Sequence, residues 1–293
     1  MKIHSRWVAG SNNKVVKETA RLKRKRNRYA GRLFLAEGED LLESALGRGV
    51  FPERVFVPGG HEEEMAERLR QRAGGSAGAA VDLFSCPDMV LARLSGLGSG
   101  SRVISVFRFV DHPLGDLRPA PGAGTFLYLA GAADPGNVGT LIRTAAAFGA
   151  GGVILGPGCA DPYGAKAMRA TMGSIFEVPF CLDISVRQLA AWTAETGLDI
   201  IAADPRQGKP AWEADLSGEA ILALGAERDG LPETVLTAAA RIVRIPQSAG
   251  AESLNVAMAG SVLLYEGLRQ RMRRAQSRAQ VGRAGSSAGR LKF

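Results

Sequence analysis

The strongest constraint on the fold is a series of short apolar runs in the second half of the chain. They are continuous rather than alternating, and they cover residues 125–130, 152–155, 198–203, 220–224 and 242–245. A strand that is apolar at every position is buried on both faces, as in a parallel sheet covered by helices. Helical patterns are predicted at residues 137–148, 185–196, 232–240 and 253–274. This half is therefore predicted to be an α/β domain that binds its ligand in loops at the carboxyl ends of the strands.

A smaller α/β pattern precedes it, at residues 33–110. Short strands are predicted at residues 34–36, 55–57, 81–84 and 103–109. Helices are predicted between them, at residues 38–48, 61–73 and 87–95. Residues 111–124, DHPLGDLRPAPGAG, are dense in proline and glycine and are predicted to link the two domains.

The charge of the chain is concentrated at its ends. The net charge is +8, but residues 1–32 carry eleven Lys or Arg and one acid, and residues 267–293 carry eight Lys or Arg and no acid. We interpret residues 1–32 as a basic helical extension that contacts the phosphates of a polyanionic partner, although a basic end can also simply increase solubility. Residues 275–293 are low in apolar content and are predicted to be a disordered basic tail.

Composition excludes several classes of protein. With 293 residues and 46% hydrophobic content, the chain has room for two domains, and no apolar run approaches the ~20 residues that span a bilayer. The N-terminus lacks the apolar core of a signal peptide. Three widely spaced cysteines suit the cytoplasm rather than a disulfide framework or a zinc site. The three histidines lie outside every motif, so no metal is expected.

Polar residues in three strand-to-helix loops are candidates for a functional site. Asn137 begins one predicted helix and Arg143 follows on it, Glu227 lies in a second loop, and Ser253 and Asn255 open the last helix. Each has an ordinary alternative: a helix cap for Asn137 and Ser253, a surface charge for Arg143 and a surface turn for Glu227. Asn255 is harder to explain as a cap, because it is expected just inside an apolar helix.

Taken together, these loops resemble the SpoU/TrmH family of RNA 2′-O-ribose methyltransferases, in the SPOUT class. The first matches the pattern N-x-G-x-x-x-R-T-A-x-x-x-G from Asn137 to Gly149. The second matches G-x-E-x-x-G-L from Gly225 to Leu231, and the third matches the Ser-Leu-Asn stretch at residues 253–255. Residues 161–173 are also similar to a segment that many members carry between the first two motifs.

The resemblance implies a fold, a cofactor and partners. Residues 125–274 would form a SPOUT α/β knot, a deep trefoil knot of the chain around a parallel sheet. Residues 33–110 would be a smaller α/β RNA-binding domain similar to a ribosomal protein. The cofactor would be S-adenosylmethionine, and the active sites would lie at the interface of a homodimer. Because the tRNA-modifying branch lacks such an N-terminal domain, large-subunit (23S) rRNA is favoured over tRNA as the substrate.

The resemblance also implies roles for individual residues. The catalytic residues would be Arg143, Asn137, Glu227, Ser253 and Asn255. The cofactor would be held by the backbone around Leu224, Gly225, Gly230, Ile245 and Leu254. The residues expected to contact RNA are Lys23, Arg24, Lys25, Arg26, Arg28, Lys166 and Arg169.

Arg143 is expected to stabilise negative charge on the ribose 2′-oxygen rather than to act as a base, because the pKa of arginine is very high. Two other hypotheses stay open. The chain could be a non-catalytic RNA-binding protein on the same fold, or an enzyme that acts on a small molecule or dinucleotide. The second is disfavoured because the sequence contains neither a nucleotide-binding G-x-G-x-x-G with its acidic partner nor a G-x-x-x-x-G-K-[ST] loop.

Overall fold

The structure is a computed structural model that describes residues 1–74, 80–96, 101–118, 124–248 and 254–288. The chain divides into two compact units, each built from several separate segments. The first unit comprises residues 1–111, 134–143 and 160–179, and the second comprises residues 112–133, 144–159 and 180–293. Two segments of the predicted catalytic domain therefore belong to the same unit as the N-terminal domain.

The first unit contains a mixed five-stranded sheet. Its strands, in spatial order, are β1 (Lys2–Trp7), β4 (Ala80–Cys86), β3 (Arg54–Pro58), β5 (Ile104–Arg108) and β2 (Leu33–Glu37). Strand β4 pairs in parallel with both neighbours, and β5 pairs antiparallel with both of its own. The helices of this unit are α1 (Lys14–Arg21), α2 (Lys25–Gly31), α3 (Glu39–Gly47), α4 (Glu62–Ala73), α5 (Asp88–Leu94) and α7 (Ala165–Thr171), together with the start of α6 (Pro135–Ala147) and a short 3-10 helix (Ser174–Phe176). The elements predicted between residues 33 and 110 are all present, with ends shifted by at most two residues.

The first 32 residues are an integral part of this unit, and the prediction of a separate helical extension is wrong. Strand β1 forms the edge of the sheet beside β4, and Val16 and Leu22 are buried in the core. Strand β1 was not predicted, because it is exposed along nearly its whole length and so lacks an alternating apolar pattern. The predicted basic helix is in fact two helices, α1 and α2, separated by a turn.

Arg28 is buried, which corrects its prediction as an RNA contact. Its guanidinium donates hydrogen bonds to the carbonyl oxygens of Leu22 (2.8 Å) and Lys23 (2.9 Å) and forms an ion pair with Asp161. Only 8% of the Arg28 side chain and 9% of the Asp161 side chain are exposed. The charge of Arg28 is therefore used inside the protein, where it fixes α2 to the segment that precedes α7.

Tyr163 joins the segment that precedes α7 to the end of the N-terminal domain. Its hydroxyl donates to Asp111 Oδ1 (2.8 Å) and accepts from the backbone amides of Val110 (2.8 Å) and Asp111 (2.9 Å). Its ring stacks on Phe109 with 3.9 Å between centroids and also contacts Phe34. Burial and the Asp111 carboxylate strongly raise the pKa of the Tyr163 hydroxyl, which therefore remains a neutral hydrogen-bonding group.

The second unit contains a seven-stranded sheet in which every pair of strands is parallel, as predicted. Its strands, in spatial order, are β10 (Lys209–Pro210), β12 (Arg241–Arg244), β9 (Asp199–Ala203), β11 (Ala220–Gly225), β6 (Phe126–Ala130), β7 (Gly152–Leu155) and β8 (Phe180–Cys181). Its helices are α8 (Val186–Thr196), α9 (Glu233–Ala238) and α10 (Val256–Ala288), together with the end of α6 (Pro135–Ala147) and a short 3-10 helix (Leu114–Asp116). Strands β8 and β10, of two residues each, and helix α7 were not predicted.

Both faces of this sheet are covered. Ile221 and Ala223 of β11 pack in one core cluster with Leu189 and Trp192 of α8 and with Val235 of α9. The intervening side chains of β11 point to the opposite face, where α10 contacts the strand. Leu117 is buried in the same cluster, so the described part of the predicted linker is anchored to this unit.

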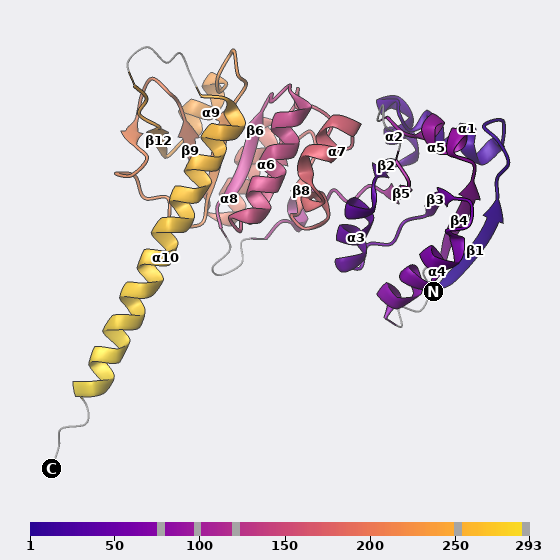
Figure 1. Ribbon diagram of the computed structural model, residues 1–293. Coiled ribbons are helices and arrows are strands. Elements are labelled where there is room, and N and C mark those ends of the chain that lie inside the picture. The colour runs from indigo at the N-terminus through magenta and orange to yellow at the C-terminus, as the bar shows by residue number, and fades with distance from the viewer. Residues whose placement is uncertain (75–79, 97–100, 119–123, 249–253, 289–293) are drawn as a thin grey trace. The chain divides into compact units, whose positions relative to one another are not determined.

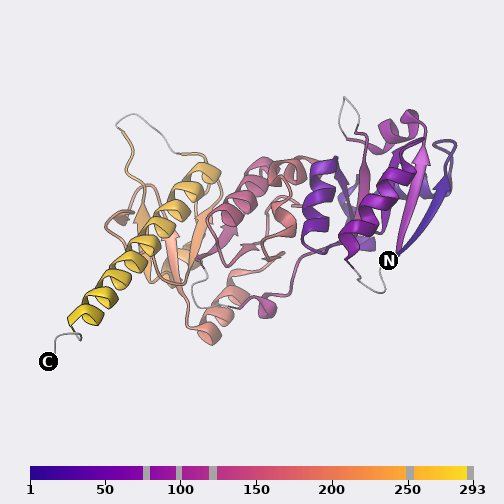
Figure 2. The same ribbon diagram turned by 60° about the horizontal axis from the view of Figure 1, so that its bottom comes forward.

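Helix α10 differs from the prediction at both ends. It begins at Val256 rather than at residue 253, and it continues to Ala288, through most of the tail predicted to be disordered. The extra turns contain several Ala, Gln and Arg residues, which favour helix, and extending an existing helix needs no new nucleus. Figures 1 and 2 both show α10, in yellow, extending beyond the sheet of its own unit. None of the helices in the described ranges has the length and apolar character that crossing a membrane requires.

Replacing Arg28 by alanine is expected to lower the free energy of unfolding by about 3–5 kcal/mol, because the Asp161 carboxylate would stay buried without its cation. Urea unfolding followed by circular dichroism measures this change. Arg26→Ala is the matched control: Arg26 lies on the same helix but is exposed, so its loss should change stability by less than about 0.5 kcal/mol. Equal stability of the two variants would contradict the structural role of the ion pair.

Candidate active site

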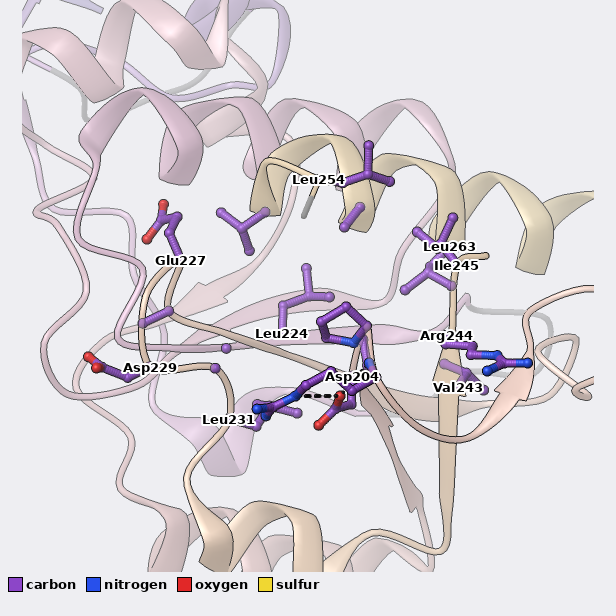
Figure 3. Close-up of a pocket in the computed structure, with 18 of the residues that line it drawn as sticks. Asp204, Leu224, Glu227, Asp229, Leu231, Val243, Arg244, Ile245, Leu254 and Leu263 are labelled. Atoms are coloured by element: carbon purple, nitrogen blue, oxygen red, sulfur yellow. Dashed lines mark hydrogen bonds and ion pairs between the residues drawn. The ribbon is translucent and has the colours of Figure 1, made fainter. Parts of the chain in front are cut away.

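A cavity of the second unit lies where three neighbouring strands end. Strands β12, β9 and β11 are adjacent and parallel, so their carboxyl ends meet at one edge of the sheet. The loops that follow them and the first turns of α10 enclose a cavity of about 330 Å³. Figure 3 shows Leu224 near its middle, Leu254 and Leu263 at the side of α10, and Glu227 at one end.

This cavity gathers residues that the resemblance assigned to the cofactor. All five line it: Leu224, Gly225, Gly230, Ile245 and Leu254. Glu227, predicted to be catalytic, also lines it and is exposed. They come from three segments of the chain and are brought together by the order of the parallel strands.

Two glycines shape the loop after β11. The loop is closed by reciprocal hydrogen bonds, from the Ala226 amide to the Gly230 carbonyl oxygen (3.1 Å) and from the Gly230 amide to the Ala226 carbonyl oxygen (3.0 Å). Gly230 has a φ of +69°, a left-handed conformation that favours glycine. A Cβ on Gly225 would lie 2.1 Å from the Gly230 carbonyl carbon, so only glycine lets the backbone approach this closely. The glycines of the second motif are therefore explained by backbone geometry.

Sequence reasoning missed several polar residues of the cavity, chiefly Asp204, Arg206, Arg244 and Gln247. Asp204 follows β9 directly and is only 6% exposed. Burial acts to raise the pKa of Asp204, but hydrogen bonds from the Arg206 amide (2.7 Å) and the Gln207 side chain outweigh it and hold the pKa below its usual range. In the sequence, Asp204 stands at the end of an apolar run, and this same position identified Glu227 as a candidate.

Asn255 caps helix α10, which corrects the expectation that it lies inside the helix. Its side-chain oxygen accepts hydrogen bonds from the backbone amides of Ala257 (2.9 Å) and Met258 (3.3 Å). These are orphan donors of the first turn, and an asparagine satisfies them well. Ser253, predicted as the cap, lies outside the described residues.

Asp134, rather than Asn137, caps helix α6. Asp134 Oδ1 accepts from the Asn137 amide (3.0 Å), and its other oxygen pairs with Lys166 Nζ (2.6 Å). The bond from Lys166 and those from the backbone hold the pKa of Asp134 below its usual range. Gly139 lets α6 pass close to α7, because a Cβ there would lie 2.3 Å from the Ala167 carbonyl oxygen. Segment 161–173 thus contacts the first motif directly.

Asn137 and Arg143 lie on α6 in the first unit, whereas all residues of the cavity belong to the second. Arg143 is exposed and forms no ion pair with any acid in the described part of the chain. Its guanidinium therefore presents its donors at the surface of α6.

Comparison with known proteins identifies the family. The profile of the SpoU rRNA Methylase family matches residues 124–265, and that of the MRM3-like substrate binding domain matches residues 13–104. A tRNA/rRNA methyltransferase of Synechocystis is 32% identical over 266 residues, covering 90% of this chain and 93% of the relative. The chain belongs to the SpoU rRNA methylase family.

Two further relatives are similar over nearly their whole length. The 23S rRNA (guanosine(2553)-2′-O)-methyltransferase RlmP of Bacillus subtilis is 27% identical and covers 88% of this chain and 97% of its own. The crystal structure of an AdoMet-bound rRNA methyltransferase from Sinorhizobium meliloti has a TM-score of 0.81 and 30% identity, covering 91% of this chain and 98% of that one.

These comparisons confirm three predictions. They are the family, the α/β fold with a parallel sheet, and the class of enzyme, an RNA methyltransferase that uses S-adenosylmethionine. The trefoil knot stays a prediction. The substrate-binding profile begins at residue 13 and so includes most of the segment that the sequence had separated as an extension.

The residues of the cavity fit S-adenosylmethionine. Apolar side chains of Leu224, Val243 and Ile245 offer a surface for the flat adenine ring. The side-chain oxygen of Gln247 is buried and accepts no hydrogen bond within the described residues, which leaves an acceptor for an amino group. The volume of about 330 Å³ lies in the range of roughly 300–1,000 Å³ that is usual for small-molecule sites.

Gly225→Ala is expected to weaken S-adenosylmethionine binding at least about tenfold, or by about 1.4 kcal/mol, because the added Cβ displaces the loop at Gly230. Isothermal titration calorimetry on the full chain measures the affinity. The control is Gly218→Ala in the same unit, where a Cβ would meet nothing within 4 Å. Unchanged affinity of Gly225→Ala would place the cofactor elsewhere.

Proposed function

We propose that the protein transfers a methyl group from S-adenosylmethionine to a ribose 2′-hydroxyl of large-subunit (23S) rRNA in the cytoplasm. The observation that carries the proposal is the cavity at the ends of β9, β11 and β12, with all five expected cofactor residues in its wall. The similarity to RlmP, a 23S rRNA 2′-O-methyltransferase, along 97% of that protein supports rRNA rather than tRNA.

Each residue of the three motifs has a role in this proposal. When bound, S-adenosylmethionine supplies an activated methyl group. The cofactor is held by the backbone at Leu224, Gly225, Gly230, Ile245 and Leu254. The exposed guanidinium of Arg143 orients the ribose 2′-oxygen and stabilises the negative charge that develops on it as the 2′-hydroxyl loses its proton to water. Asn137 orients the ribose beside it, and Glu227 hydrogen-bonds to the ribose from the rim of the cavity.

The two residues of the third motif act through helix α10. Asn255 fixes the first turn of the helix, and so positions the neighbouring Leu254 at the cavity. Ser253 is proposed as the second positioning residue, as the family resemblance implies. Both are positioning residues in this mechanism.

Basic residues of the first unit form the RNA-contacting surface. Arg24, Lys25 and Arg26 are exposed at the start of α2, and Lys166 and Arg169 are exposed on α7. Exposed cations attract the phosphate backbone and release its counterions on binding. Lys23 is exposed too, but its ammonium donates to the carbonyl oxygens of Arg93 and Ser95 (2.6 Å each), so it is held in place.

A row of exposed apolar side chains on α10 supports a homodimer with active sites at the subunit interface. Met258, Val262, Tyr265 and Met272 are 63%, 44%, 54% and 56% exposed. Their spacing places them along one face of the helix. Exposed apolar patches of this kind mark interfaces. In a two-fold dimer the stripe meets its own copy, and no other partner is needed to bury it.

The test is transfer of labelled methyl from S-adenosylmethionine to unmodified large-subunit rRNA, small-subunit rRNA and tRNA in parallel. Incorporation is expected in large-subunit rRNA only, with a 2′-O-methylated nucleoside as product. Incorporation into tRNA alone would show that tRNA, and not rRNA, is the substrate. Cofactor binding without transfer to any free RNA would contradict free rRNA as the substrate, and absence of both would favour the non-catalytic RNA-binding protein.

The same assay tests Arg143. Arg143→Ala is expected to reduce methyl transfer by at least about a hundredfold, the effect of losing one oxyanion-stabilising donor, while cofactor affinity stays unchanged. Arg187→Ala, another exposed helical arginine, is the control and should keep full activity. Near-normal turnover of Arg143→Ala would exclude its catalytic role.

Val262→Glu is expected to convert the dimer to a monomer, because it places a charge in the middle of the apolar stripe. Size-exclusion chromatography with light scattering over a range of protein concentrations measures the mass. Ala190→Glu adds the same charge to an exposed position of α8 and should leave the dimer intact. A wild-type protein that is monomeric at every concentration would disprove the homodimer.

A further inference from the structure

A second cavity lies wholly within the first unit. Most of its wall comes from α2, β2, α3 and α7 and from the turn between α1 and α2. Its volume is about 130 Å³. It is lined by Leu22, Lys23, Arg28, Leu35, Glu37, Leu41, Gly96, Tyr163, Ala165, Met168 and Arg169. Lys23 and Arg169, two residues expected to contact RNA, are far apart in the sequence and meet at this cavity.

The walls of this cavity are apolar and well fixed. The apolar residues of the wall are all buried, and none is more than 9% exposed: Leu22, Leu35, Leu41 and Met168. A dry cavity of about 150 Å³ is large enough to bind benzene. The cavity of the first unit is therefore of a size for a single six-membered ring, and too small for the fused rings of a purine.

Polar groups at its edge are held in fixed positions. The Glu37 carboxylate accepts hydrogen bonds from the Gly96 amide (2.7 Å) and the Ser95 hydroxyl (2.8 Å). The Lys23 ammonium is held by two carbonyl oxygens, and the buried Arg28 forms the wall behind it. Because each carboxylate oxygen can accept more than one hydrogen bond, Glu37 can still accept from a ligand.

We propose that this cavity binds one unpaired pyrimidine base of the RNA substrate. This inference rests on the proposed function, because it requires the substrate to be RNA. The pyrimidine ring packs against the apolar walls, and Glu37 accepts a hydrogen bond from its N3–H or 4-amino group. Arg169, exposed at the edge, pairs with the adjoining phosphate. Proteins commonly read RNA in this way, by taking up unstacked bases of single-stranded loops.

The test is binding of labelled ten-nucleotide RNAs to the full chain, measured by fluorescence anisotropy at one fixed, low salt concentration. The probes are oligo(U), oligo(C), oligo(A) and an abasic ribose-phosphate oligomer of equal length. Both pyrimidine oligomers are expected to bind about tenfold more tightly than the abasic oligomer, the effect of burying one base. Oligo(A) is expected to bind like the abasic oligomer.

Two variants locate the effect. Ala165 is exposed at the first position of α7 and lines the cavity, so Ala165→Phe should block it and abolish the pyrimidine preference. Ala190→Phe, on α8, is the control for an added exposed ring. Arg169→Ala should weaken binding of all four oligomers equally, because it removes a phosphate contact, and should keep the pyrimidine preference.

The inference is overturned if purine and pyrimidine oligomers bind equally, or if Ala165→Phe retains the preference. S-adenosylmethionine binding is measured on the same samples. An unchanged circular-dichroism spectrum and urea unfolding midpoint of Ala165→Phe show that the variant is folded. A missing base preference in a wild-type protein that binds cofactor contradicts only the base site. Loss of cofactor binding by the wild-type protein would instead contradict the proposed function.

Discussion

The parallel hydrogen bonding of β12, β9 and β11 is the constraint on which the candidate active site depends. Parallel strands end at the same edge of a sheet, so three loops from distant parts of the chain must meet there. The sheet is covered on both faces, so β11 up to Leu224 and the middle of β9 consist of buried apolar residues. Asp204 and Glu227 follow the ends of these two strands, where the cavity forms.

Buried polar contacts give the first unit its organisation. The Arg28–Asp161 ion pair and the hydrogen bonds of Tyr163 join residues of the N-terminal domain to the segment before α7. From there, Lys166 and the close approach at Gly139 reach the start of α6, which carries Asn137 and Arg143. The N-terminal domain is thus connected, contact by contact, to the first motif of the methyltransferase family. These same contacts form one wall of the small cavity lined by Lys23, Glu37 and Arg169.

Several predictions from the sequence were wrong for a common reason: a local pattern does not state what a side chain contacts. Arg28 looked like a neighbour of Lys25 and Arg26 in a basic run, but it lies on the buried face of α2, where it contacts the Leu22 carbonyl oxygen and Asp161. Asn255 looked like a functional polar residue inside a helix, but the helix begins one residue later and Asn255 caps it. Strand β1 has no apolar alternation because it lies at the edge of the sheet and is exposed along nearly its whole length.

The sequence by itself determined most of the strands and helices, the parallel sheet and the three family motifs, because each depends on residues close together in the chain. Apolar runs, glycines at tight turns and motif spacing are all local information. Only the tertiary structure decided which charges are buried, that five expected cofactor residues share one cavity with Asp204 and Gln247, and that two segments of the catalytic domain belong to the first unit. Those features depend on contacts between residues up to more than a hundred positions apart, such as Arg28 and Asp161, and no local pattern encodes such a pairing.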